Sequence, residues 1–169
     1  MYLTPFVSIF REQGLKETRV ITIRHYPGLP DDDYALIEAY CTDPECDCRR
    51  VMLNVVSQRL PGTQLASISF GFDRHDEMAG PFLDPLNPRS HFADALLALV
   101  ADILNDPAYV ARLESHYHQF KRAITDPKDP GYETMRRIRA DEKRWEASED
   151  RKPVARLATG SRKRRKKKR

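Results

Sequence analysis

The sequence predicts an α+β fold: a four-stranded antiparallel meander backed by two amphipathic helices, followed by a peripheral third helix and a disordered basic tail. Three observations lead to this prediction. The first half of the chain alternates apolar and polar residues with a period of two, which is typical of half-buried strands. The second half repeats apolar residues at helical spacing. Residues 151–169 carry eleven Lys or Arg and no acidic residue.

Four segments of the first half carry the strand pattern. They are residues 18–24, 34–41, 51–55 and 65–72, and their alternating positions are rich in β-branched and aromatic side chains. Turn-forming residues separate them, because Pro27-Gly28, Asp43-Pro44 and Pro61-Gly62 fall between the runs. Connections this short favour antiparallel neighbours, since parallel strands need a crossover of about a dozen or more residues.

Two amphipathic helices are expected after the sheet, over residues 92–104 and 107–120. Asp106 is placed to cap the second helix, and Pro107 suits its first turn. Both helices need an apolar surface, which one face of the sheet supplies. A third helix over residues 132–148 has sparse apolar positions among Arg and Glu, so Met135 is expected to lie largely outside the core.

The resulting organisation has three parts. Residues 1–125 are expected to form the compact domain, residues 126–148 a charged helical extension, and residues 149–169 a disordered basic tail. A chain of 169 residues is near the usual size of one domain. The tail has too few apolar groups to offset the entropy lost on ordering.

Charge is distributed unevenly between body and tail. The body keeps 18 basic and all 25 acidic residues, a net charge of −7, whereas residues 151–169 carry +11. A basic arm on an acidic body indicates that the arm meets an anionic partner or folds back on the body.

The compartment is expected to be the cytoplasm. The N-terminus shows no secretory signal, and no stretch reaches the roughly 20 apolar residues of a membrane span, so a soluble protein with no membrane partner is expected. Three cysteines close in sequence make a poor disulfide framework and fit a reducing compartment, as thiols or as metal ligands.

The cysteine loop, residues 41–48, is the sharpest local feature. It reads Cys41-Thr-Asp-Pro-Glu-Cys46-Asp-Cys48. Three thiols this close can converge on one soft cation, and zinc takes four tetrahedral ligands from thiolate and imidazole. The sequence therefore predicts a zinc site at Cys41, Cys46 and Cys48, with a fourth position left for His, Asp or water. The alternative is that the three cysteines bind no metal and that Cys41 is buried as a small apolar residue.

Strand alternation selects the histidine that could complete the site. His25 ends the first strand of a hairpin at the end opposite Cys41, more than about 20 Å away. The strand over residues 65–72 returns toward the cysteine end, so His75 is the preferred fourth ligand and His91 the second choice. His116 lies near the apolar stripe of the second helix and His118 off it, so the two are not expected to share a metal.

The cysteine loop also admits a second interpretation. Cys46 and Cys48 could form a tight disulfide with Cys41 as the resolving thiol, and Arg49 or Arg50 could lower a thiol pKa. The function expected first is nevertheless that of a small non-enzymatic binding or accessory protein. The alternative is a thiol redox or metal-dependent enzyme that uses this loop.

The end of the tail predicts contact with nucleic acid through phosphates. No aromatic residue interrupts it, so base stacking is not implied. A solubilising terminus or an intramolecular partner for the acidic body would explain the same composition. The residues concerned are Arg162, Lys163, Arg164, Arg165, Lys166, Lys167, Lys168 and Arg169.

Three segments together resemble a bacterial domain with a Cys-x4-Cys-x-Cys pattern. They are residues 40–49, 82–88 (Phe-Leu-Asp-Pro-Leu-Asn-Pro) and 106–110 (Asp-Pro-Ala-Tyr-Val), within a similarity that spans residues 30–122. The domain forms the N-terminal part of some proteins that end in a SEC-C motif, a small zinc-binding tail. Residues 160–167 resemble that motif in glycine, serine and lysines but lack every cysteine. The resemblance implies a degenerate tail that keeps only its charge, and it implies no reaction.

Overall fold

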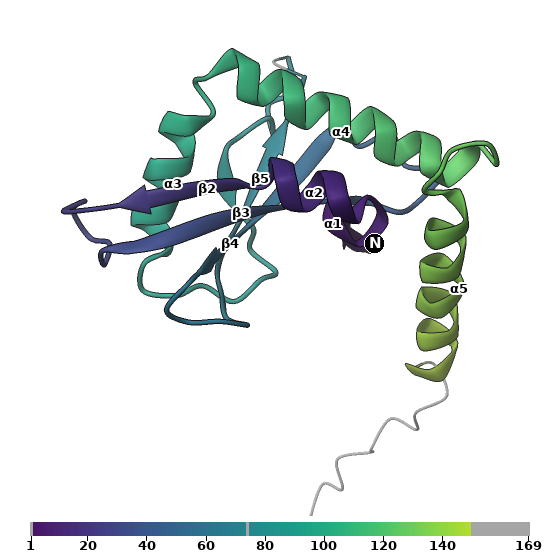
Figure 1. Ribbon diagram of the computed structural model, residues 1–169, viewed down its shortest axis with the longest axis horizontal. Helices are drawn as coiled ribbons and strands as arrows, with labels where there is room; N and C mark the ends of the chain where they lie inside the picture. Colours follow the sequence, from purple (N-terminus) through teal and green to yellow (C-terminus); the bar gives the residue numbers. More distant parts are fainter. Residues whose placement is uncertain (1, 74, 150–169) are drawn as a thin grey trace, which may run out of the picture.

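The computed structural model describes residues 2–73 and 75–149, and in these residues helices pack against one antiparallel sheet (Figure 1). The strand order is β1-β3-β4-β5-β6, and β2 pairs with β3 beside β1. The strands are β1 (Leu3–Pro5), β2 (Arg19–Ile23), β3 (Asp32–Cys41), β4 (Arg50–Ser57), β5 (Gln64–Gly71) and β6 (Phe82–Leu83).

The predicted meander is confirmed for β2 to β5, which pair as consecutive antiparallel neighbours. The predicted count of four strands is wrong, because β1 and β6 extend the sheet to six strands within the described residues. β1 and β2 lie end to end along one edge of β3, with Leu3 opposite Cys41 and Ile23 opposite Asp32. Strands of three and two residues are too short to show a period of two, which is why the pattern missed them.

A helical hairpin, α1 (Phe6–Ile9) and α2 (Arg11–Glu17), joins β1 to β2 and was not predicted. α1 inserts Phe6 and Ile9 into the core. The two helices pack closely because Gly14 has no side chain: a Cβ there would lie 2.7 Å from the Cα of Val7. Neither helix is long enough to display an amphipathic pattern.

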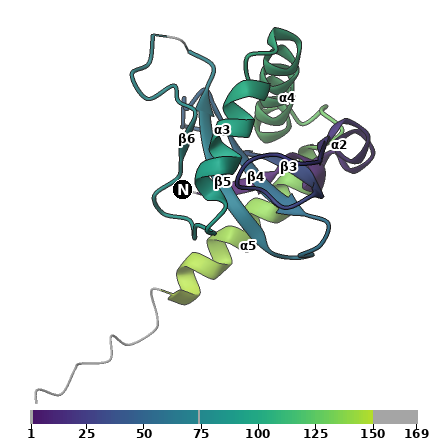
Figure 2. The ribbon, with the colours of Figure 1, turned by 90° about the vertical axis from the view of Figure 1, so that its left-hand side faces the viewer.

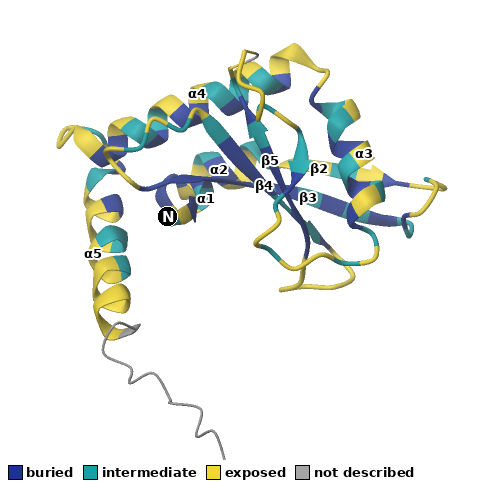
Figure 3. Ribbon diagram, turned by 180° about the vertical axis from the view of Figure 1, so that it is seen from behind, coloured by how far each residue is buried: buried dark blue, intermediate teal, exposed yellow. Residues whose placement is uncertain are grey.

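The two predicted amphipathic helices are confirmed as α3 (Ala93–Ile103) and α4 (Pro107–Thr125). Asp106 caps α4 as expected, since its Oδ1 accepts a hydrogen bond from the N–H of Ala108 at 3.0 Å. α3 packs on β5 and β6, and α4 packs on β3 and β4. Buried residues lie along the strands and on the inner faces of these helices (Figure 3).

The third helix is confirmed as α5 (Tyr132–Glu149), and it extends away from the sheet in two perpendicular views (Figures 1 and 2). The expectation that Met135 lies outside the core is wrong, because Met135 is 1% exposed and belongs to the core cluster. Gly131 allows this approach: a Cβ there would lie 2.7 Å from Cγ2 of Ile9. Glu142 adds a second attachment by accepting hydrogen bonds from Thr4 and Thr42.

The predicted disordered tail lies outside the described residues, apart from Glu149, which ends α5. Its eight proposed nucleic-acid contacts, residues 162–169, lie there as well. Within residues 2–73 and 75–149, no helix combines the length and apolar character needed to cross a membrane.

Candidate metal centre

The cysteine loop connects β3 to β4 at one end of the sheet. Cys41 is the last residue of β3, and Arg50 begins β4. The loop is fixed at both ends by backbone hydrogen bonds, from Thr42 N–H to the carbonyl of Tyr2 at 3.2 Å and from Phe72 N–H to the carbonyl of Arg49 at 2.9 Å. The chain therefore enters and leaves the loop in fixed positions.

The three cysteines converge, as the sequence predicts. Their sulfur atoms all lie within 4.8 Å of one another, and none forms a disulfide. Cys41 is buried, whereas Cys46 and Cys48 are half-buried. Sulfurs around a tetrahedral zinc ion lie about 3.8 Å apart, given Zn–S bonds of about 2.3 Å. This group could therefore hold a metal ion after a small contraction.

Helix α4 holds the outer side of the loop. Lys121 Nζ donates hydrogen bonds to the carbonyl oxygens of Asp43 at 3.0 Å and Cys46 at 2.9 Å. Arg49 Nη2 forms an ion pair with Glu114 Oε1 at 2.8 Å. Glu114 and Lys121, seven residues apart on α4, thus hold the two halves of the loop.

The three thiols differ in acidity because their surroundings differ. Burial raises the pKa of Cys41 above its ordinary value. At Cys46 burial also opposes ionisation, but hydrogen bonds from the thiol and the backbone N–H of Cys48, together with the charge of Lys121, bring the pKa below its ordinary value. Burial and the neighbouring sulfurs raise the pKa of Cys48. The surroundings of Cys46 therefore favour its thiolate more than those of Cys41 and Cys48 do.

The histidines considered as fourth ligands lie in different places. His25 lies at the far end of the β2–β3 hairpin, where its N–H bonds Asp31 at 2.7 Å, as the strand alternation predicts. β5 does return to the cysteine end, since Phe72 N–H bonds the carbonyl of Arg49. His75 follows in an exposed loop and is not among the side chains that converge with the three sulfurs.

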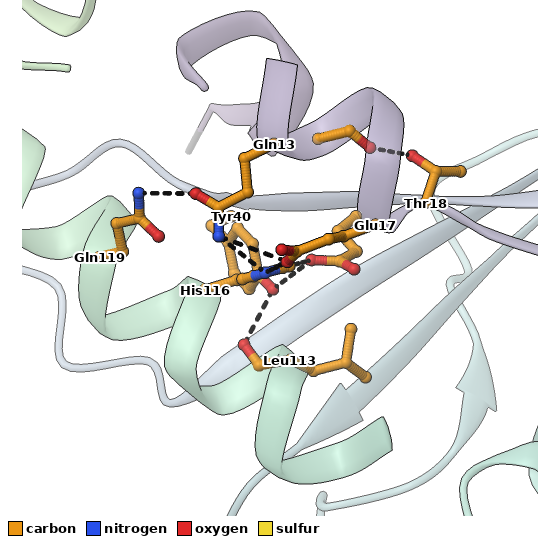
Figure 4. A network of polar contacts seen from close by, with 9 residues as sticks. Gln13, Glu17, Thr18, Tyr40, Leu113, His116 and Gln119 are labelled. Atoms are coloured by element: carbon orange, nitrogen blue, oxygen red, sulfur yellow. Dashed lines mark hydrogen bonds and ion pairs between the residues drawn. The ribbon is translucent and has the colours of Figure 1, made fainter. Parts of the chain in front are cut away.

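A second polar cluster, which we call the His116 cluster, lies between α2, β3 and α4 (Figure 4). His116 Nδ1 lies 2.7 Å from Glu38 Oε2, and its Nε2 lies 2.6 Å from Glu17 Oε2. Tyr40 Oη donates toward Glu38 Oε2 at 2.9 Å and the carbonyl of Leu113 at 3.0 Å. The ring of Phe6 stacks on the imidazole at 4.2 Å.

Electrostatics favour the protonated form of His116. Burial disfavours the charged imidazole, but the hydrogen bonds and charges of Glu38 and Glu17 outweigh that cost and raise the pKa of His116. The same contact lowers the pKa of Glu17 against the opposing effect of burial. The adjoining cavity measures about 10 Å³, which is at most the space of one water molecule. The His116 cluster thus binds helices to the sheet and has no room for a substrate.

Sequence reasoning missed this cluster although a signal was present. Glu38 lies between Leu36 and Tyr40 on the inward face of β3, and His116 lies among the apolar positions of α4. Each of these two buried faces carries one ionisable residue. Because a buried charge requires a partner, the sequence predicts that the two side chains contact each other. Glu17 had no such signal, because α2 itself was not predicted.

Comparisons with protein-family models, with curated proteins and with solved structures found no match to this chain.

Proposed function

We propose that this protein is a non-enzymatic metal-binding accessory protein in which Cys41, Cys46 and Cys48 hold a structural Zn²⁺. The observation that carries the proposal is the convergence of three sulfurs within 4.8 Å on a loop anchored at both ends. Thiolate sulfur selects soft or borderline cations such as Zn²⁺ over Mg²⁺ or Ca²⁺. The resident ion would fix the β3–β4 connection against α4.

The loop needs such an ion because it has little apolar packing of its own. Asp43, Pro44, Glu45 and Asp47 are exposed, and the contacts that hold the loop are polar. A structural metal contributes its binding free energy to folding when the unfolded chain holds no preformed site. A reducing cytoplasm, which we propose as the location, would keep the three thiols available.

Metal content and thermal stability test the proposal together. We expect one zinc per chain in protein purified without added metal, and a lower melting temperature after chelation. Cys46→Ser should abolish both the zinc and the effect of chelator, whereas Ser57→Ala, in β4, should leave both unchanged. Protein that contains no zinc and does not bind it on titration would contradict the proposal.

Contact with nucleic acid through the tail is the second part of the proposed function. It is supported by the eleven basic and no acidic residues of positions 151–169. Neutralised phosphates release counterions, so affinity for duplex DNA should fall with salt at a log–log slope of about −0.9 per phosphate contacted. Deleting residues 151–169 should abolish binding and leave the melting temperature unchanged. Equal binding by full-length and truncated protein would contradict this part.

A thiol redox function is the competing candidate, and the lowered pKa of Cys46 favours it. The Cys46 thiolate would attack the disulfide of a substrate, form a mixed disulfide and release one substrate thiolate. A neighbouring cysteine thiolate would then displace the second substrate thiolate, so that the substrate is reduced and the loop keeps a disulfide. Mass spectrometry after mild oxidation of metal-free and zinc-loaded protein separates the two functions. A reversible disulfide in protein that never binds zinc would favour the redox function and contradict the structural one.

A further inference from the structure

The two anchors of the cysteine loop on α4 define which helical residue faces the sulfurs. Glu114 holds Arg49, the residue directly after Cys48, and Lys121 holds the backbone of Cys46. Because these contacts bracket residues 46–48, the stretch of α4 between Glu114 and Lys121 runs past the two half-buried cysteines. With a rise of about 1.5 Å per residue, that stretch is about 10 Å long.

His118 lies in this stretch, one turn after Glu114 and one turn before Lys121. It lines a surface pocket of about 470 Å³ together with Cys46, Asp47 and Lys121. Its side chain is 58% exposed, so the imidazole can change rotamer without displacing core atoms. His118 and Cys46 thus line one pocket. The ring nitrogens of His118, like those of His75, lie outside the group that converges within 4.8 Å, so a rotamer change is needed to bring the imidazole to the open side of the cysteine group.

Glu114 lies close enough to His118 to orient it after a small movement. Its Oε1 is 4.0 Å from His118 Nε2, which is longer than a hydrogen bond, and it accepts one from Arg49. If metal binding brings the two atoms into hydrogen-bond range, the carboxylate would hold the proton on Nε2 and leave the lone pair of Nδ1 for the metal. Histidines that bind metals commonly have such a carboxylate on the second nitrogen.

We propose that His118 supplies the fourth ligand to the metal held by Cys41, Cys46 and Cys48. This inference rests on the proposed metal-binding function and adds to it a residue on α4, so that the ion would join the β3–β4 loop to that helix. Three thiolates and one imidazole form a common closed tetrahedral set for structural zinc.

Two protein side chains compete with His118 for this position. Asp47 lines the same pocket, but it belongs to the loop and would add no link to α4. His75 follows β5 in the loop whose Met78 carbonyl and Asp76 contact Arg50, beyond the β4 end of the cysteine loop. Neither lies between the two anchors on α4.

Cobalt titration of the full chain tests the proposal. Co²⁺ reports its ligands through thiolate charge-transfer bands and through visible bands that respond to the fourth ligand. His118→Ala should weaken Co²⁺ and Zn²⁺ binding by about 100-fold or more, because even outer-shell changes cost about 10- to 100-fold. It should also shift the visible bands while keeping the charge-transfer bands. Added imidazole should restore the wild-type spectrum.

Matched variants make each outcome decisive. His75→Ala and Asp47→Asn should bind Co²⁺ as the wild type does, and Cys46→Ser should lose the thiolate bands. A wild-type spectrum and affinity for His118→Ala would overturn the assignment, as would a loss confined to His75→Ala or Asp47→Asn. If the wild type shows no thiolate bands at all, the proposed metal function fails, and His118 fails with it.

Discussion

The cysteine loop and the His116 cluster are two groups of polar side chains against the same helix, and they differ in how far the protein satisfies them. Both ring nitrogens of His116 meet carboxylates, and Phe6 stacks on the ring, which is itself buried, while the Glu17 side chain stays 33% exposed. The three sulfurs of the loop converge without forming a disulfide, beside a surface pocket. The polar atoms of the His116 cluster find their partners within the protein, whereas the three sulfurs of the cysteine loop could hold a metal ion.

The comparison teaches that clustering of titratable groups does not by itself mark a functional site. A cluster that the protein satisfies internally stabilises the fold, because every charge has its partner and water is excluded. A cluster with free donor atoms at the surface can take a ligand without breaking existing contacts. On this criterion the loop is the functional candidate, although the His116 cluster holds more charge.

The largest effect is expected from breaking the satisfied cluster. His116→Leu leaves Glu38, which is 6% exposed, without its cation, and should reduce the free energy of unfolding by about 3–5 kcal/mol. His118→Leu, two residues along on the exposed side of α4, should change stability by less than about 0.5 kcal/mol in metal-free protein. Urea unfolding of both variants tests this, and equal losses would show that burial of His116 is energetically unimportant.

The core contribution of α5 should come next. Met135→Ala should cost about 2–5 kcal/mol, in the range expected for Leu96→Ala and Phe120→Ala, because all three side chains are 1% exposed or less. Trp145→Ala, on the same helix but 58% exposed, should cost about 1 kcal/mol or less. Chemical denaturation measures these differences. A Met135→Ala loss as small as that of Trp145→Ala would place α5 outside the core.

The His116 cluster should make stability depend on pH. Because the pKa of His116 is raised in the folded protein, its contribution is complete below the ordinary value of 6.5 and is lost as pH rises through the folded value. Glu17, whose pKa is lowered, contributes above its ordinary value of 4.5 and loses that contribution as pH falls. The charged groups facing His116 are Glu17 and Glu38, and Arg112 acts on Glu17.

Melting temperatures of metal-free protein across this range test the pH dependence. The wild type should lose stability above neutral pH, and His116→Leu should remove that part of the dependence. The Cys46→Ser variant provides the control, since a thiol that ionises at alkaline pH would also change stability there. A decline that persists in His116→Leu and disappears in Cys46→Ser would assign it to the loop instead.

The smallest effect on folding should come from loosening the loop. Lys121→Met removes the two hydrogen bonds to Asp43 and Cys46, and should cost about 1–2 kcal/mol in zinc-loaded protein because the bonds are charge-assisted but partly exposed. Arg122→Met, a neighbour whose side chain is 60% exposed, serves as the control and should cost less than about 0.5 kcal/mol. Thermal denaturation separates the two. Equal costs would show that α4 does not hold the loop.

The central part of the fold could be predicted from the sequence because long elements repeat their pattern. β3 and β4 show the strand period over ten and eight residues, and α4 shows the helical period over 19. β1, β6 and the α1–α2 hairpin fall below that length, and their positions depend on pairing with β3 and β5. Burial of Met135 was missed because it depends on Gly131, which lets Ile9 and Phe10 approach closely.

The sequence predicts the convergence of candidate site residues that are close in the chain, but it does not encode contacts between distant ones. Convergence of Cys41, Cys46 and Cys48 follows from their spacing on a turn between antiparallel strands. His118 reaches the same pocket only because Glu114 and Lys121 hold α4 against the loop, 65 and 75 residues from their partners. No local pattern encodes those contacts, so the sequence favoured His75, which follows β5 at the same end of the sheet.

X-ray absorption at the zinc edge of the zinc-loaded full chain tests the central claim most directly, because it counts the atoms bound to the metal. Our account predicts three sulfur ligands at about 2.3 Å and one nitrogen at about 2.0 Å, with the nitrogen lost in His118→Ala and retained in His75→Ala. A first shell of nitrogen and oxygen without sulfur would contradict the claim that the cysteine loop is a metal centre.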